Sequence, residues 1–159
     1  MKKIILWAVL FMVTASYQLN ACTTAVISGK ATLDGRPLLW KHRDADDFNN
    51  KIVFENGPRF SYLALINSAD PDRHAWAGTN STGFAIMNSA SYNIKPKDDT
   101  TKIADLEGYI MKLALGLCVT INDFANMLDT LPRPWGVSAN FGIIDAEGGA
   151  GYFEVNNYS

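Results

Sequence analysis

Residues 22–46 read CTTAVISGKATLDGRPLLWKHRDAD, and the fold that we expect is built outward from this stretch. Two β-prone runs, 23–28 and 38–43, stand on either side of an Asp34-Gly35 pair, which is typical of a tight hairpin turn. The stretch therefore predicts two antiparallel strands at the start of the fold.

The register of this hairpin decides which side chains meet its first residue. If a two-residue turn is centred on the Asp-Gly pair, Asp46 lies opposite Thr23, next to Cys22. Arg43 then lies opposite Val26, on the face of Cys22 but about 13 Å along the strand. A β-bulge or the length of the arginine side chain would have to close that gap.

The first 21 residues are predicted to be a targeting segment. Lys2 and Lys3 form a positive start, residues 4–13 form an apolar run, and residues 14–21 are polar and small. An apolar run of ten residues is too short to span a bilayer as a stable helix. We therefore expect an exported protein, periplasmic or extracellular, with residues 22–159 as one domain and no transmembrane span after removal of the leader.

Cleavage between Ala21 and Cys22 would give Cys22 a free α-amine. Such an amine titrates near pH ~8 and can take the proton of the thiol, so that one residue supplies both a nucleophile and its base. Leu19-Asn20-Ala21-Cys22 also resembles a bacterial lipobox, in which the cysteine is lipidated and its amine is acylated. A lipid anchor would abolish the catalytic interpretation, and the sequence leaves both alternatives open.

The composition excludes some classes of partner. The 159 residues include 14 basic and 16 acidic side chains, for a formal charge of −2. This balance argues against nucleic acid or an anionic membrane surface as the main partner. The hydrophobic share of 48% is ordinary for a globular chain.

Strands and helices are expected in separate blocks after the first hairpin. Further strands with tight connections are predicted at residues 51–54, 61–66, 74–77, 83–88, 139–144 and 151–155. A helix at 105–118 would bury an apolar face made of Leu106, Tyr109, Ile110, Leu113, Ala114 and Leu117. This order favours an α+β fold with helices packed on an antiparallel sheet, or on two such sheets.

A second helix is predicted at 120–131, with Thr120 and Asp123 as its capping box. Its core stripe would be Ile121, Phe124, Ala125 and Leu128. Cys118 falls in the apolar helical run 110–119, and a buried free thiol is expected there, with a disulfide to Cys22 as the alternative.

The opening of the chain resembles a known class of enzymes. The residues CTT at 22–24 after a leader, DG at 34–35 and the pattern Arg43-x-x-Asp46 are similar to the start of the N-terminal-nucleophile (Ntn) hydrolases. The similarity is to the linear amide hydrolases: choloylglycine hydrolase, penicillin V acylase and acyltransferases of the isopenicillin-N acyltransferase type. It covers residues 22–155 and implies an αββα sandwich of antiparallel sheets with helices outside. Family members continue beyond the position of Ser159, so a C-terminally incomplete domain is expected.

Specific roles follow from this resemblance. Cys22 Sγ would attack an amide carbonyl, and its own amine would carry the proton to the leaving group. Arg43 would lie near the thiolate, which its charge favours, and Asp46 would hold the α-amine. Asn88 resembles the asparagine that donates to the oxyanion in choloylglycine hydrolases, although a strand-ending asparagine can also be a simple turn residue. Without Cys22, Arg43 and the acidic residues around it would be interpreted as a solvated strand end.

The function implied is cleavage of a linear amide, or transfer of its acyl group, through a thioester on Cys22. The alternatives are a cysteine dipeptidase of the same superfamily and a lipoprotein that uses Cys22 only as an anchor. A small-molecule amide is the expected partner, no cofactor or metal is expected, and the acyl group and oligomeric state stay open.

A Cys-His pair, in which His74 acts as the base of Cys22, is an alternative to the α-amine. Candidates for the lining of an acyl pocket, or for the core, are Trp40, Trp76, Phe84, Tyr92 and Trp135.

Overall fold

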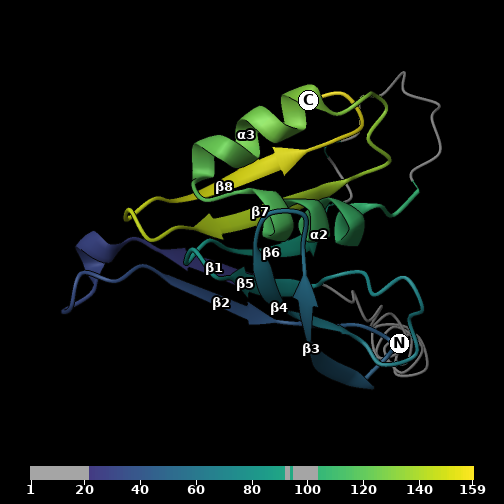
Figure 1. Cartoon of the computed structure of the whole chain (residues 1–159), viewed down its shortest axis with the longest axis horizontal. Helices are drawn as coiled ribbons and strands as arrows, with labels where there is room; N and C mark the ends of the chain where they lie inside the picture. Colours follow the sequence, from purple (N-terminus) through teal and green to yellow (C-terminus); the bar gives the residue numbers. More distant parts are fainter. Residues whose placement is uncertain (1–21, 92–93, 95–103) are drawn as a thin grey trace, which may run out of the picture.

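The computed structural model describes residues 22–91, 94 and 104–159, so the predicted targeting segment 1–21 lies outside the described residues. The described part is an α+β fold in which antiparallel strands form two sheets and two α-helices cover one face (Figure 1). The elements in chain order are β1 (Thr23–Ile27), the 3-10 turn η1 (Gly29–Ala31), β2 (Leu38–His42), β3 (Asn50–Asn56), β4 (Ser61–Asn67), β5 (Ala77–Asn80), β6 (Ala85–Ala90), α2 (Glu107–Leu117), α3 (Ile121–Thr130), β7 (Ala139–Ile144) and β8 (Ala150–Val155).

The larger sheet is the middle layer of the molecule. Its strands follow one another in the order β3-β4-β5-β6-β7-β8, all antiparallel, and β1 and β2 form a separate two-stranded sheet. Neighbouring residues of β7 show how the layers lie, because successive side chains of a strand point to opposite faces. Phe141 packs on Phe124 of α3 at a ring distance of 5.5 Å. A Cβ on Gly142 would instead point at Val26 of β1. The layers are therefore helices, six-stranded sheet and two-stranded sheet.

The first hairpin forms as predicted, but in a different register. Thr23 pairs with His42 and Ile27 pairs with Leu38, so residues 28–37 form a long connection that projects from one end of the molecule (Figure 1). The expected pairing of Asp46 with Thr23 and of Arg43 with Val26 is wrong. Ser28 caps the 3-10 turn that follows it, and this extra turn lengthens the connection beyond the two residues assumed.

One other strand is displaced from its predicted position. The strand expected at 74–77 lies at Ala77–Asn80, because the preceding residues are held in a turn. Asp70 Oδ2 accepts a hydrogen bond from the backbone of His74, and the hairpin to β6 then turns tightly where Gly83 N–H donates to the carbonyl of Asn80. The remaining predicted strands are confirmed within about two residues, which is the ordinary uncertainty of such boundaries.

Both predicted helices are present, and Ile110 and Ala114 of α2 are buried as predicted, but the rest of the buried face differs from the predicted one. Tyr109 is 49% exposed and Leu106 is 37% exposed, whereas the buried residues include Ile110, Met111, Ala114 and Leu115. The helix turns this face to the sheet because Gly78 of β5 leaves room for the side chain of Leu115. α2 packs on β4, β5 and β6.

Helix α3 begins as predicted. Thr120 and Asp123 form the expected capping box, and Phe124 and Leu128 are the buried residues of the stripe. Cys118, just before this helix, is a free thiol with 1% exposure, and burial raises its pKa to about 12. The expected buried thiol is thus confirmed. Within residues 22–91, 94 and 104–159 no helix is both long and apolar enough to cross a membrane.

Candidate active site

Cys22 lies directly before β1, at the end of the ladder in which Thr23 pairs with His42. One further step along the two strands brings Cys22 opposite Arg43. Its half-buried thiol points at the carbonyl oxygen of Asp44, with 3.7 Å between Sγ and the oxygen. The register that the sequence did not predict therefore brings the end of β2 to the predicted nucleophile.

Lys41 is a half-buried cation on the inward face of β2. It lies in β2 opposite Thr24, and its Nζ donates hydrogen bonds to the carbonyl oxygen of Trp76 at 2.8 Å and to Asn88 Oδ1 at 2.7 Å. Burial lowers the pKa of Lys41 from its ordinary 10.5 to about 8. Cys22 opposes this shift and Arg43 adds to it, so both groups act on the lysine from close by.

Asn88 is connected to Cys22 through this lysine. It lies in β6 with 6% of its surface exposed, and its Oδ1 accepts the hydrogen bond from Lys41. An ammonium group has only donors, so the atom that it contacts at 2.7 Å must be the amide oxygen. The NH₂ group of Asn88 is consequently turned away from Lys41.

Arg43 is held firmly beside this group by other residues. Its Nη1 donates to the carbonyl of Asp47 at 3.0 Å and to Asn50 Oδ1 at 2.9 Å, and its Nη2 donates to Asn67 Oδ1 at 2.8 Å. Its guanidinium also lies 5.1 Å from the ring centre of Trp76. The guanidinium thus connects the loop after β2 to the end of β4.

The roles predicted for Arg43 and Asp46 stay predictions. The ladder brings Arg43 opposite Cys22, but the hydrogen bonds of its guanidinium go to Asp47, Asn50 and Asn67. Asp46 is exposed in the loop that joins β2 to β3. The hydrogen bond from Lys41 to Asn88 and the electrostatic effect of Cys22 on Lys41 add two residues to the surroundings of Cys22.

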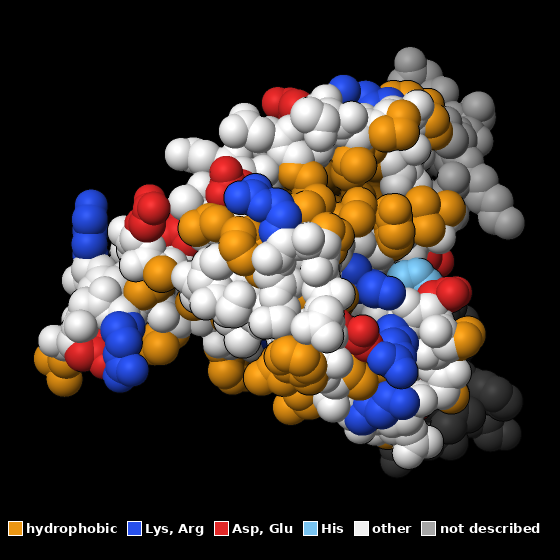
Figure 2. Space-filling model, viewed as in Figure 1, with side chains coloured by type: hydrophobic (Ala, Val, Ile, Leu, Met, Phe, Trp, Pro, Cys, Tyr) orange, Lys and Arg blue, Asp and Glu red, His pale blue; other side chains and the backbone are white. Residues whose placement is uncertain are grey.

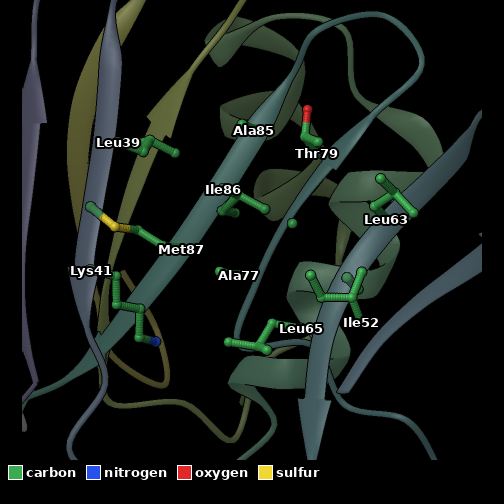
Figure 3. Close-up of a pocket in the computed structure, with 12 residues that line it drawn as sticks. Leu39, Lys41, Ile52, Leu63, Leu65, Ala77, Thr79, Ala85, Ile86 and Met87 are labelled. Atoms are coloured by element: carbon green, nitrogen blue, oxygen red, sulfur yellow. The ribbon is translucent and has the colours of Figure 1, made fainter. Parts of the chain in front are cut away.

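An apolar trough of about 450 Å³ lies next to Lys41 on the face of the large sheet. Figure 3 shows Leu39 and Lys41 on one side, Ile52, Leu63 and Leu65 on the opposite side, and Ile86 and Ala77 between them. Ile52 is 71% exposed at its margin. In Figure 2 hydrophobic side chains gather at the lower edge of the view, where β3 lies in Figure 1. The trough is open to solvent and has the stem of Lys41 as part of its wall.

The aromatic residues that were predicted to line an acyl pocket do not line the trough. Phe84 and Trp135 belong to the helix-side core, Trp40 is 53% exposed on the outer face of β2, and Tyr92 lies outside the described residues. Trp76 lies beneath Arg43, and its buried Nε1 has no hydrogen-bond partner among the described residues. Aliphatic side chains, rather than aromatic ones, line the trough.

His74 has a partner of its own, because its Nδ1 lies 3.1 Å from Asp70 Oδ2 in the turn between β4 and β5. Asp72 is close enough for the three residues to offer ligand atoms within 4.8 Å of one another. However, Asp70 already accepts hydrogen bonds from the backbone of Asp72 and of His74. This arrangement is that of an ordinary Asx turn and gives no support for a metal.

Lys41 is the site residue that sequence reasoning missed. The signal was the alternation along β2, in which Leu38, Trp40 and His42 are exposed while Leu39 and Lys41 are turned inward. A lysine on the inward face of a strand needs a hydrogen-bond acceptor in the interior. The partner, Asn88, is 47 residues away and could not be identified from spacing.

Comparisons of the chain with protein-family models, with curated proteins and with solved structures found no match in any of the three.

Proposed function

We propose that this chain is an exported Ntn cysteine hydrolase that cleaves a linear amide, or transfers its acyl group, through a thioester on Cys22. The observation that carries the proposal is the position of Cys22 directly before β1, with its thiol beside the carbonyl of Asp44 and in electrostatic interaction with the half-buried Lys41. The thiolate is the nucleophilic form of a cysteine. Lys41 in turn binds Asn88, the expected oxyanion donor.

The proposed reaction has two halves. In the first, Cys22 Sγ bonds to the amide carbonyl carbon and its proton passes to the α-amine of the same residue. The C–N bond then breaks, and the α-ammonium returns the proton to the leaving amine. In the second half, water or another amine attacks the thioester carbonyl carbon and passes its proton to the α-amine. The C–S bond then breaks and the α-ammonium returns the proton to the sulfur, so that the acyl product leaves and the thiol is restored.

The layer order supports an Ntn sandwich as the finer description of the fold. Helices, a six-stranded sheet and a second sheet are three successive layers of an αββα arrangement. The outer face of the second sheet carries Ile27, Leu38 and Trp40, which are 36%, 49% and 53% exposed. An apolar face of this kind is what a further helical layer covers in such a sandwich.

The trough suggests what part of a substrate would lie beside Lys41. Its lining is almost entirely aliphatic, so an apolar acyl group suits it better than a charged one. Lys41 lies at the polar end of this lining and connects it to Cys22. The amide carbonyl would then lie at the cysteine and the acyl chain along the sheet.

The first experiment is the intact mass of the purified chain after expression with its own N-terminal segment. We expect a product that begins at Cys22 with an unmodified amine. A diacylglyceryl adduct would contradict the proposal and support the lipid anchor instead. A panel of chromogenic amides and of dipeptides then separates an acylase from a dipeptidase.

The second experiment replaces the nucleophile. Cys22→Ala should abolish both amide turnover and acylation of the protein by a slow substrate, as seen by mass spectrometry, because no thioester can form. Cys118→Ala is the matched control, since that thiol is buried beneath the helices and is expected to leave turnover unchanged. Turnover retained by Cys22→Ala would refute the proposal.

A further inference from the structure

We propose that Lys41 is a positioning residue of this site, whose ammonium holds the Asn88 carboxamide so that its NH₂ group is presented to the oxyanion. The proposal rests on the proposed function and adds to it a residue that acts through another side chain. It is carried by two hydrogen bonds of a half-buried ammonium, one to Asn88 Oδ1 and one to the carbonyl of Trp76.

The geometry selects one orientation of the amide. A carboxamide can turn by 180° and exchange its oxygen with its NH₂ group. With Lys41 protonated, the turned form would bring NH₂ donors against NH₃⁺ donors, so only one form is bonded. The second hydrogen bond, to Trp76, keeps the ammonium from following the amide if it turns.

In this orientation the NH₂ group of Asn88 is available to donate hydrogen bonds. Oδ1 of Asn88 is occupied by Lys41, and Nδ2 has no acceptor among the described residues. Donors that are already oriented before the charge develops stabilise a tetrahedral oxyanion most effectively. Lys41 would therefore act before the chemical step, and it does not need to touch the substrate.

The kinetic test is a double-mutant cycle on the full chain, read as kcat and KM for the best amide of the panel. Asn88→Ala should lower kcat about 10²–10³-fold, as expected for the loss of one oxyanion donor. Lys41→Met should lower kcat about tenfold or more, with KM nearly unchanged. In the Asn88→Ala background the lysine replacement should cost less than about twofold, because the two residues act as one unit. Lys51→Met, an exposed lysine of β3, is the control.

The cycle can overturn the proposal in two ways. A kcat of Lys41→Met within twofold of the wild type means that the lysine does not matter for the reaction. An equal loss in both backgrounds means that it acts on Cys22 by charge and not through Asn88. Circular dichroism of each variant reports whether it is folded.

A second measurement, an NMR titration, requires no substrate and no enzymatic activity. The side-chain NH₂ signals of Asn88, assigned by their loss in Asn88→Ala, are followed by ¹⁵N NMR as the pH is raised. They should shift with a midpoint near 8, the pKa of Lys41, and this transition should be absent in Lys41→Met. A Cys22→Ser chain removes any contribution of the thiol.

The NMR titration distinguishes failure of the positioning role from failure of the proposed function. Signals of Asn88 that do not respond to the titration of Lys41 overturn the positioning role, whatever the enzyme does. A clear NMR transition in a chain that cleaves no amide would instead refute the proposed function and leave the pairing of Lys41 with Asn88 intact.

Discussion

At the scale of single residues, the buried ammonium of Lys41 is the most consequential group. Burial lowers the pKa of Lys41 most, Cys22 raises it by a smaller amount, and Arg43 lowers it by the smallest amount. Each neighbour therefore has an effect of known sign that a substitution can isolate.

Replacing the two neighbours should move the titration of Lys41 in opposite directions. Cys22→Ala should lower the pKa of Lys41 below about 8, because the stabilising thiolate is lost. Arg43→Met should raise it, because a repelling cation is lost. The measurement is the ¹³Cε shift of Lys41 against pH, assigned by its loss in Lys41→Met. Two shifts of the same sign would show that the three groups are not electrostatic neighbours.

The same pKa predicts how stability depends on pH. Between about pH 8 and 10.5 the unfolded chain keeps the proton of Lys41 while the folded chain loses it. Stability therefore rises with pH in this window, by up to roughly 3 kcal/mol at about 1.4 kcal/mol per unit. Below pH 8 the folded chain bears the full cost of burying the charge.

Urea unfolding of wild type and Lys41→Met at pH 7, 9 and 10 tests this prediction. The stability of the wild type relative to the variant should increase over that range. The raised pKa of Cys118 makes the stability of both chains fall as the pH rises above 9. This effect cancels when the stability of the variant is subtracted from that of the wild type. A constant difference would show that Lys41 is not buried in its charged form.

At the scale of elements, glycines set how closely α2 approaches the sheet. Gly116 near the end of α2 touches the β3–β4 hairpin, and its carbonyl accepts hydrogen bonds from the backbone of Arg59 and Phe60. A Cβ at this position would lie 2.6 Å from the ring carbon Cδ of Pro58. A proline ring cannot rotate away, so the helix and the hairpin would have to separate.

Gly116→Ala should lower the free energy of unfolding by about 1–2 kcal/mol, since overpacking outweighs the better helix propensity of alanine. Gly151→Ala in β8 is the matched control, because its Cβ would lie 3.8 Å from the nearest atom, Ile121 Cδ1. The control should be neutral or slightly stabilising. A Gly116→Ala chain as stable as the wild type would contradict the close contact.

At the scale of the whole molecule, we expect the layer that carries Cys22 to be the less stable one. The β1–β2 sheet has only two strands and is held on the large sheet through contacts with β6, β7 and β8. Two-stranded sheets are marginal by themselves. The candidate site is therefore on the part of the fold that opens most easily.

Native-state hydrogen exchange should reveal this difference. Val26→Ala removes two methyl groups that pack toward Gly142, a loss of about 1.5 kcal/mol. Amides of β1 and β2 should then exchange roughly tenfold faster, while those of β6 and β7 stay unchanged. Leu38→Ala, on the outer face and 49% exposed, is the control. Equal acceleration in both sheets would mean that the layers unfold as one unit.

The sequence alone was sufficient for the local elements. Alternation and turn residues predicted most strands, and the capping box of Thr120 and Asp123 predicted the start of α3, because these signals act over a few neighbouring residues. The candidate nucleophile, Cys22, was also identified from its position after the apolar run 4–13 and the small, polar residues that follow it. The face buried by α2 was not, since it depends on Gly78, a distant residue that leaves room for Leu115.

Only the tertiary structure decided the register of the first hairpin and the environment of Cys22. The 3-10 turn after β1 shifts the pairing so that Cys22 comes opposite Arg43, and no local rule fixed the length of that connection. The pairing of Lys41 with Asn88 arises because a buried ammonium must find an acceptor, and the layers bring one from 47 residues away. Hydrogen bonds between layers depend on packing, which is a property of the whole chain.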